Sequence, residues 1–182
     1  MKTKNEQQNL IQNLVKTALF AAIILAVTGY LPRIPIAGGA GGYIHLGDVI
    51  IYISASVLPM PYACIAGALG AGLADAMTGF AAWSPATVII KALMAAMFTA
   101  KSAKMLPVRN IIAVLPAGII CAGGYYLYEC LLTSSFAVPL VSVPFNLIQA
   151  GLSAVIYIIF AFALDKINIK TKIERGFNDE RF

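Results

Sequence analysis

Lys91 places a cation inside an otherwise apolar segment, residues 84–100. A full charge at the centre of a membrane-spanning helix costs about 2.5–3.5 kcal/mol on insertion scales. A carboxylate, a water-filled cavity or a ligand has to offset this cost. The helices of the fold must therefore bring a compensating group to the ammonium of Lys91.

The composition is that of an integral membrane protein. Of the 182 residues, 60% are hydrophobic and 12% are charged, and the mean hydropathy is +0.83. A soluble domain carries about 25% charged residues. The length fits a single compact domain, residues 1–182. The net charge of +5 does not indicate nucleic-acid binding, because the basic residues lie mostly at the ends of apolar segments, as they do beside membrane lipid.

Six apolar segments are the helices expected to position Lys91. Crossing a bilayer takes about 20 residues, and the second segment is shorter than that. It is therefore predicted to be tilted, interrupted, or a partial span shielded by protein. The segments cover residues 10–31, 46–58, 62–78, 84 to the basic cluster at 101–104, 110–132 and 141–164.

The distribution of Lys and Arg orients these segments. With both termini in the cytoplasm, eleven of the thirteen cations lie on the cytoplasmic side, and only Arg33 and Lys91 do not. An odd number of spans would place one terminal cluster outside. The prediction is an all-α membrane protein with six transmembrane helices in one bundle and cytoplasmic N and C termini. The Pro- and Gly-rich outer loop, residues 32–42, is expected to be a lid over a cavity or a plain connector.

This topology gathers polar and aromatic side chains in the outer half of the bundle. The inner half is expected to be nearly bare of them, which disfavours a channel, since a channel needs polar lining throughout. Trp and Tyr can stack on a flat heterocycle, and Asn, Gln and Glu can bind its polar atoms. The sequence therefore predicts an outward-facing pocket. Its predicted substrate-binding residues are His45, Asp48, Trp83, Lys91, Tyr125, Tyr128, Glu129, Asn146 and Gln149.

Several of these residues also have a purely structural interpretation. Trp83 and the tyrosines could form an interfacial aromatic belt. Asn146 and Gln149 lie three residues apart on one helix face and could bridge helices. His45 could be solvated at the membrane boundary. Glu129 is the hardest to explain in this way, because it lies about one turn inside its helix.

Lys91 has two possible roles that the sequence leaves open. It could contact the ligand, or it could be braced by Asp48 or Asp75. The brace is favoured, because the pairing offsets the burial of the charge whether or not a ligand is bound. Asp75 is accordingly expected to be a structural polar residue.

A stripe of small residues marks one face of the first helix. Ala18, Ala22 and Ala26 recur at intervals of four, which lets another helix approach closely in lipid. The neighbour could be a helix of this chain or a separate membrane subunit. Residues 66–74 hold a denser run of Gly and Ala, which is expected to pack inside the bundle.

The motifs of several other chemistries are missing. The sequence has no phosphate-binding loop of the Gly-x-x-x-x-Gly-Lys-Ser/Thr type, so ATP hydrolysis by that route is excluded. One histidine and three scattered cysteines make a metal site unexpected, and no Ser or Cys lies beside a histidine base. We expect no catalytic residue, metal or cofactor, and therefore not an enzyme.

Four segments in this order resemble a known family. The sequence is similar to the S component, the substrate-binding membrane subunit, of energy-coupling factor (ECF) transporters. It looks closest to the branch that includes riboflavin, hydroxymethylpyrimidine and pyridoxine carriers. The segments are Tyr43-Ile-His-Leu-Gly-Asp-Val-Ile, Ala66-Gly-Ala-Leu-Gly-Ala-Gly-Leu-Ala-Asp75, Trp83-Ser-Pro-Ala-Thr-Val-Ile-Ile-Lys91 and Pro144-Phe-Asn-Leu-Ile-Gln149.

The resemblance implies a function and partners. Such proteins are multi-pass proteins of the prokaryotic plasma membrane that bind a vitamin or its precursor tightly near the outer face, under the first loop. They dock on a transmembrane coupling subunit driven by two cytoplasmic ATPases. An Ala-x-x-x-Ala stripe, here Ala18, Ala22 and Ala26, contacts that subunit. The bound S component is thought to topple in the membrane to release its ligand inside.

Two other functions are compatible with the residues alone. One is a stand-alone secondary carrier or facilitator for a heterocyclic solute, with Glu129 and Lys91 as a proton relay. The other is a membrane scaffold that transports nothing. No internal repeat stands out in the sequence, which weakens the case for a secondary carrier.

Overall fold

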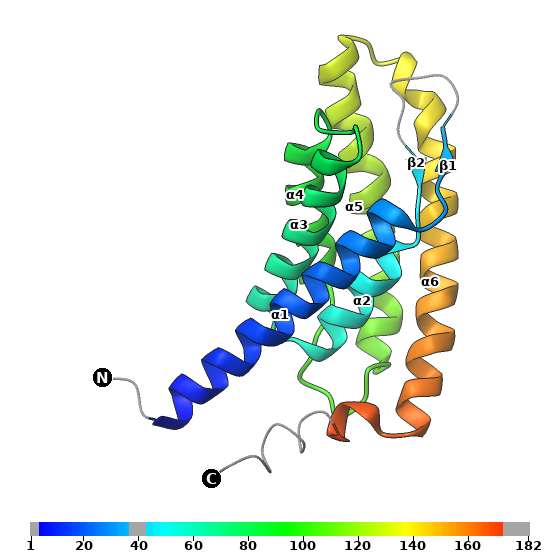
Figure 1. The fold of residues 1–182 in the computed structure, drawn as a ribbon. Helices are drawn as coiled ribbons and strands as arrows, with labels where there is room; N and C mark the ends of the chain where they lie inside the picture. The colour runs from blue at the N-terminus through cyan, green and yellow to red at the C-terminus, as the bar shows by residue number, and fades with distance from the viewer. Residues whose placement is uncertain (1–3, 37–42, 173–182) are drawn as a thin grey trace.

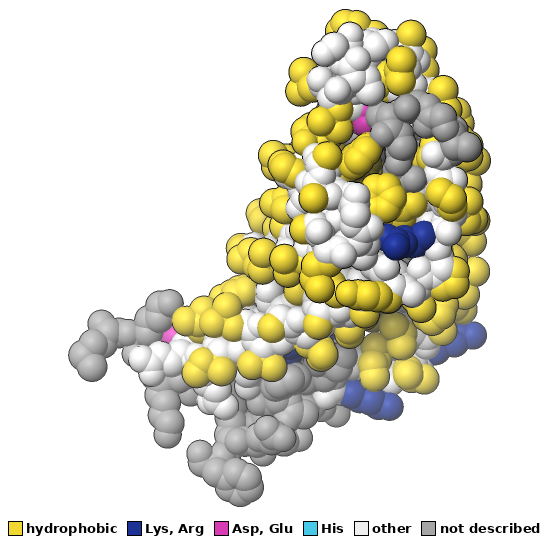
Figure 2. Space-filling model, turned by 45° about the horizontal axis from the view of Figure 1, so that its top comes forward, with side chains coloured by type: hydrophobic (Ala, Val, Ile, Leu, Met, Phe, Trp, Pro, Cys, Tyr) yellow, Lys and Arg dark blue, Asp and Glu magenta, His cyan; other side chains and the backbone are white. Residues whose placement is uncertain are grey.

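The computed structural model describes residues 4–36 and 43–172. The Gly-rich part of the predicted lid, residues 37–42, lies outside the described residues, as do Lys2, Arg175 and Arg181. Apolar side chains are spread over the described part of the face seen in Figure 2, as expected for a surface in contact with lipid.

Six α-helices account for most of the described chain, one in each predicted apolar segment (Figure 1). Two short strands, β1 (Ile34–Pro35) and β2 (Tyr43–Ile44), pair antiparallel between the first two helices, and a 3₁₀ helix, η1 (Val138–Val141), precedes the last. We call the pair β1 and β2 the strap. The helices are α1 (Lys4–Tyr30), α2 (Gly47–Val57), α3 (Met60–Met77), α4 (Ser84–Ala96), α5 (Val108–Thr133) and α6 (Ser142–Lys166).

In the part of the chain that the structure describes, four helical segments are long and apolar enough to cross a membrane, by length and composition: Glu6–Tyr30, Met60–Met77, Val108–Thr133 and Val138–Lys166. The other two apolar helices, α2 and α4, have 11 and 13 residues. The predicted shortness of the second segment is thus confirmed. Eight of the α2 residues are buried, and α2 lies among α1, α3, α4 and α6, so protein shields its ends.

The prediction that the fourth helix reaches the basic cluster at 101–104 was wrong, because α4 ends at Ala96. The side chain of Asn110 holds the backbone of Thr99 outside the helix. Its Oδ1 accepts the Thr99 N–H at 2.9 Å, and its Nδ2 donates to the Thr99 carbonyl at 2.9 Å.

The helix α1 crosses the bundle obliquely and packs on α3, which also packs on α4 (Figure 1). The predicted internal packing of the Gly- and Ala-rich run is confirmed, since Ala66, Ala71 and Ala74 are fully buried. Gly70 permits the close approach, because a Cβ there would lie 2.6 Å from the carbonyl oxygen of Ala21. The first half of α1 extends away from the bundle (Figure 1).

The expectation of a nearly bare inner half was wrong. Asn110 is fully buried and also donates to Ser56 Oγ at 3.3 Å and to the Met105 carbonyl at 3.0 Å. Tyr157 donates to the same Met105 carbonyl at 3.0 Å. Ser56, Asn110 and Tyr157 come from three separate helices, so no motif in the sequence marks them as a cluster. We call Ser56, Asn110, Tyr157 and Lys170 the inner cluster.

Lys170, from the C-terminal basic group, is also buried. Its Nζ donates to three carbonyl oxygens, of Ser56 at 2.9 Å, Ala100 at 2.5 Å and Ser102 at 2.6 Å. The inner cluster therefore ties the chain after α6 to the end of α2 and to the loop after α4. Its groups bind one another and the backbone, which is a structural arrangement.

Candidate functional site

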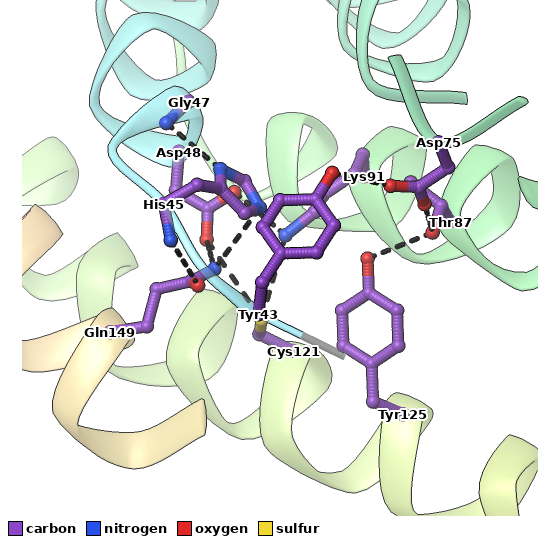
Figure 3. A network of polar contacts seen from close by, with 10 residues as sticks. All are labelled: Tyr43, His45, Gly47, Asp48, Asp75, Thr87, Lys91, Cys121, Tyr125 and Gln149. Carbon is purple, nitrogen blue, oxygen red and sulfur yellow. Dashed lines mark hydrogen bonds and ion pairs between the residues drawn. The ribbon is translucent and has the colours of Figure 1, made fainter. Parts of the chain in front are cut away.

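The ammonium of Lys91 meets the carboxylate of Asp48. Nζ lies 2.7 Å from Oδ1, and both side chains are fully buried (Figure 3). The other carboxylate oxygen, Oδ2, accepts a hydrogen bond from Nε2 of Gln149 at 2.8 Å. Cys121 Sγ lies 3.6 Å from Nζ. A pair with these additional hydrogen bonds satisfies the condition under which a buried ion pair is tolerated.

Gln149 also holds the strap. Its Oε1 accepts the backbone N–H of His45 at 3.0 Å, so one amide of α6 joins the residue after β2 to the carboxylate of α2. The His45 side chain accepts the backbone N–H of Gly47 on Nδ1 at 3.0 Å. Burial, with smaller effects of Lys91 and Arg33, lowers the pKa of His45 to about 4 against the opposing effect of Asp48.

A second network surrounds Asp75 (Figure 3). Its Oδ2 accepts from Thr87 Oγ1 at 2.5 Å and its Oδ1 from the Tyr43 hydroxyl at 2.7 Å. Because the Thr87 hydrogen goes to Asp75, the hydroxyl of Tyr125, 3.0 Å from Thr87 Oγ1, is the donor in that contact. Asp75 is therefore held by hydroxyl groups, and the partner of Lys91 is Asp48.

Arg33 closes this network on the strap side. Its guanidinium carbon lies 4.7 Å from the centre of the Tyr43 ring, and Nη1 donates to Thr78 Oγ1 at 2.9 Å. Burial first, and then the charge of Asp75, raise the pKa of Tyr43, so its hydroxyl keeps its proton as the hydrogen-bond donor to Asp75.

A pocket lies between the two networks, under the strap. It is a crevice of about 390 Å³, a volume that includes space open to solvent. Aromatic rings form much of its wall, with the rings of Tyr43 and Phe80 4.5 Å apart and those of Phe80 and Trp83 5.8 Å apart. It is lined by Ile36, Tyr43, His45, Asp75, Phe80, Trp83, Tyr125, Glu129, Asn146 and Gln149.

Two lining side chains keep unused hydrogen-bonding capacity. Glu129 is 3% exposed, and its Oε1 accepts from Nε1 of Trp83 at 3.3 Å. Its Oε2 is buried and has no hydrogen-bond partner among the residues described. The hydroxyl of Ser142, which is also buried without a partner, is a second polar group that acts on this carboxylate. The amide of Asn146 likewise makes no hydrogen bond within residues 4–36 and 43–172. A buried acceptor without a partner costs about 1–3 kcal/mol, which a ligand donor would recover.

Six of the nine predicted substrate-binding residues line this pocket. Asp48 and Lys91 do not line it and form the buried pair beyond His45 and Gln149. Tyr128 is also absent from the lining, and its hydroxyl donates to the Ala82 carbonyl at 2.6 Å. The six residues are His45, Trp83, Tyr125, Glu129, Asn146 and Gln149.

Sequence reasoning missed three lining residues, Ile36, Tyr43 and Phe80, and expected only a structural role of Asp75. Tyr43 was detectable, because residues two apart on an extended segment point the same way and His45 follows it by two. Phe80 lies in the loop before Trp83, where no periodicity applies. Ile36 precedes the undescribed part of the outer loop.

The small-residue stripe lies on the free side of α1. Ala18, Ala22 and Ala26 are all exposed, whereas Ile24, on the opposite face, is fully buried against the bundle. Within the described chain, the stripe therefore leaves its face open to a neighbour.

Comparison with known proteins identifies a family. The family model of the ECF-type riboflavin transporter, S component, matches residues 8–166, which include the strap, the pocket and nearly all of the six helices. No curated protein matches the chain. Members of this family are multi-pass plasma-membrane proteins of vitamin transport and not enzymes. The chain belongs to the S-component family of ECF-type riboflavin transporters.

Proposed function

We propose that this chain binds riboflavin, or a vitamin of closely similar shape, with high affinity at the outer face of the membrane. The observation that carries the proposal is the crevice under the strap, which combines an aromatic wall with the unpartnered carboxylate oxygen of Glu129. A flat heterocycle with an N–H group matches both features, since aromatic rings stack on its faces and the carboxylate accepts its hydrogen.

The proposed ligand contacts are the six residues predicted from the sequence that line the pocket, together with Tyr43 and Phe80. Asp48, Lys91 and Tyr128 are proposed to act on the ligand only indirectly. The ion pair of Lys91 with Asp48 holds Gln149, and Tyr128 anchors the loop before Trp83 through the Ala82 carbonyl.

We further propose that residues 1–182 form one domain with six spans and cytoplasmic N and C termini. The start of α1 and the end of α6 lie at the same end of the molecule, and the strap lies toward the other (Figure 1). The inner cluster ties the loop after α4, with Lys101 and Lys104, to the chain after α6. This arrangement agrees with a cytoplasmic excess of Lys and Arg. A C-terminal reporter that is active only in the cytoplasm tests the orientation.

Import is proposed to need a coupling subunit in the membrane and two cytoplasmic ATPases. The exposed stripe of Ala18, Ala22 and Ala26 supports this, because small residues on an open helix face suit close helix contact in lipid. The stripe is proposed to be the contact with the coupling subunit.

The fluorescence of Trp83 tests ligand binding directly, because it is the only tryptophan and it lines the pocket. Riboflavin added to the purified chain is expected to quench this fluorescence saturably and in equimolar amount, without ATP. Pyridoxine and hydroxymethylpyrimidine are the comparison ligands. Failure of riboflavin to quench contradicts the proposed ligand.

Proteoliposomes test the coupling. Riboflavin uptake is expected only when the chain is reconstituted with the ECF subunits and ATP. Uptake by the chain alone would instead support the stand-alone carrier and overturn the coupled mechanism.

A further inference from the structure

The side chain of His45 caps the first turn of α2. Gly47 is the first residue of that helix, and the first N–H groups of a helix have no partner within it. Nδ1 of His45 lies 3.0 Å from the Gly47 nitrogen and accepts its hydrogen (Figure 3). A ring nitrogen can accept only when it carries no hydrogen itself. Nδ1 of His45 is therefore unprotonated.

The other ring nitrogen must then carry the hydrogen. A neutral imidazole has one N–H, and burial keeps His45 neutral at physiological pH by lowering its pKa to about 4. The hydrogen of His45 consequently resides on Nε2, which makes that atom a donor.

The polar side-chain atom in contact with this donor cannot accept its hydrogen. Nε2 of His45 lies 3.5 Å from Nε2 of Gln149, which is itself a donor. The orientation of the Gln149 amide is fixed by two shorter contacts, to the His45 N–H at 3.0 Å and to Asp48 Oδ2 at 2.8 Å. If the amide were turned over, its NH₂ group would face the backbone N–H of His45, which is also a donor. Its oxygen would face Asp48 Oδ2, which is also an acceptor.

An N–H donor without an acceptor among the described residues therefore lies in the wall of the pocket. His45 is 7% exposed and belongs to the pocket lining. A buried donor without a partner selects strongly for a ligand that supplies one.

We propose that His45 is a specificity-determining residue that donates its Nε2–H to an acceptor atom of the ligand, a carbonyl oxygen or a pyridine-type nitrogen. This inference rests on the proposed binding of a heterocyclic vitamin in the same pocket. Glu129 is the acceptor in the same crevice. The ligand therefore binds with an acceptor atom toward His45 and a donor group toward Glu129. Heterocycles that present N–H at both places are rejected.

Nitrogen NMR of the full chain tests the tautomer without any ligand. The protein has one histidine, so ¹⁵N-labelled histidine gives a single imidazole that needs no assignment. Near pH 7 we expect a pyridine-type Nδ1 and a protonated Nε2. The opposite tautomer, or an imidazolium, overturns the proposal.

Two substitutions separate the donor from the cap. In His45→Asn, the side-chain oxygen can accept the N–H two residues on, as asparagine commonly does, and so replaces Nδ1 but not the Nε2–H. His45→Ala loses both. We expect the melting temperature of the Asn variant to stay close to wild type and that of the Ala variant to fall. Both variants are expected to bind riboflavin about 10-fold or more weakly.

The combined outcomes distinguish this inference from the proposed function. If riboflavin quenches Trp83 but leaves the Nε2 resonance unmoved, or if His45→Asn binds like the wild type, the donor role is wrong although the function stands. If the Asn variant loses stability as the Ala variant does, the wild-type Nε2 resonance is the test of the donor role. A shift of this resonance on adding riboflavin supports the role, and no shift contradicts it. If riboflavin does not bind at all, the proposed function fails and the ligand role of His45 fails with it, while the tautomer is still measured.

Discussion

Nζ of Lys91 lies 2.7 Å from Oδ1 of Asp48, and neither side chain is exposed. This relationship couples α4 to α2 in the middle of the bundle. Through the remaining carboxylate oxygen and Gln149, it also reaches α6 and the residue that follows the strap. The ion pair therefore supports the wall of the pocket from behind.

Lys91→Met is expected to lower stability more than ligand affinity. It leaves Asp48 as a buried charge without its counter-ion, a change that costs about 3–5 kcal/mol. Thermal unfolding of the purified protein measures the loss, and the double variant Lys91→Met/Asp48→Asn is expected to recover part of it. An unchanged melting temperature with weakened riboflavin binding would instead make Lys91 a ligand contact.

Glu129→Gln is expected to weaken riboflavin binding by about 10-fold or more, because it replaces one of the two carboxylate oxygens by a donor. Its stability is expected to stay level or rise, since a buried carboxylate with an unpartnered oxygen is removed. Leu131→Ala, on the lipid side of the same helix and 78% exposed, is the control for affinity. Equal affinities of the Gln variant and wild type would remove Glu129 from the site.

Ala22→Leu is expected to abolish transport and leave riboflavin binding intact, because the larger side chain blocks helix contact at the exposed stripe. Gly151→Leu is the matched control, since a Cβ at this exposed position on α6 meets nothing within 4 Å. Uptake in proteoliposomes with the ECF subunits and Trp83 quenching are measured in parallel. Loss of quenching in the Ala22 variant would mean that the stripe supports the pocket.

His45 gives the stability a dependence on pH. Its pKa is about 4 in the folded chain and about 6.5 when unfolded, so between these values the unfolded state binds the extra proton. Acidification through this window is expected to cost about 3 kcal/mol. Asp48, Lys91 and Arg33 act on His45, and His45→Asn retains them but lacks the imidazole. A melting temperature that falls equally in both proteins between pH 7 and pH 4.5 would contradict the assignment.

Asn110→Ala is expected to destabilise the fold and leave riboflavin affinity unchanged. It removes four hydrogen bonds of a fully buried amide at the end away from the pocket. Each backbone group left unpaired costs about 1–3 kcal/mol. Chemical or thermal unfolding measures the stability, and Trp83 quenching measures the affinity for riboflavin. A large loss of affinity in a folded variant would link the inner cluster to the pocket.

The sequence was sufficient for features that depend on periodicity and charge. Apolar segments located all six helices, and the isolated charge of Lys91 led to a carboxylate partner, with Asp48 and Asp75 left as alternatives. Asp48 and Asp75 are expected at a similar depth in the membrane, so the sequence does not distinguish them as partners of Lys91. The choice between them depends on how α2 packs against α4.

The missed features depend on contacts between distant segments. Asn110 begins an apolar segment and Lys170 belongs to the C-terminal basic group, and nothing in their sequence neighbourhood indicates burial. Both are nevertheless buried, in contact with the loop after α4. Phe80 joins the pocket through a loop with no repeating pattern. Such residues are placed by tertiary packing, which no local periodicity records.

The strap is attached by a small number of side-chain contacts, and this has a kinetic consequence. The bond of the His45 N–H to Gln149, the bond of Tyr43 to Asp75 and that of Arg33 to Thr78 hold its ends to the helices. Each contributes about 0.5–1.5 kcal/mol net. Their sum is small compared with unfolding a helix, so the strap is a unit that opens locally while the bundle stays folded. We therefore expect strap opening to limit the release of the proposed ligand, and we expect the His45 amide to exchange its hydrogen faster than the amides of α2.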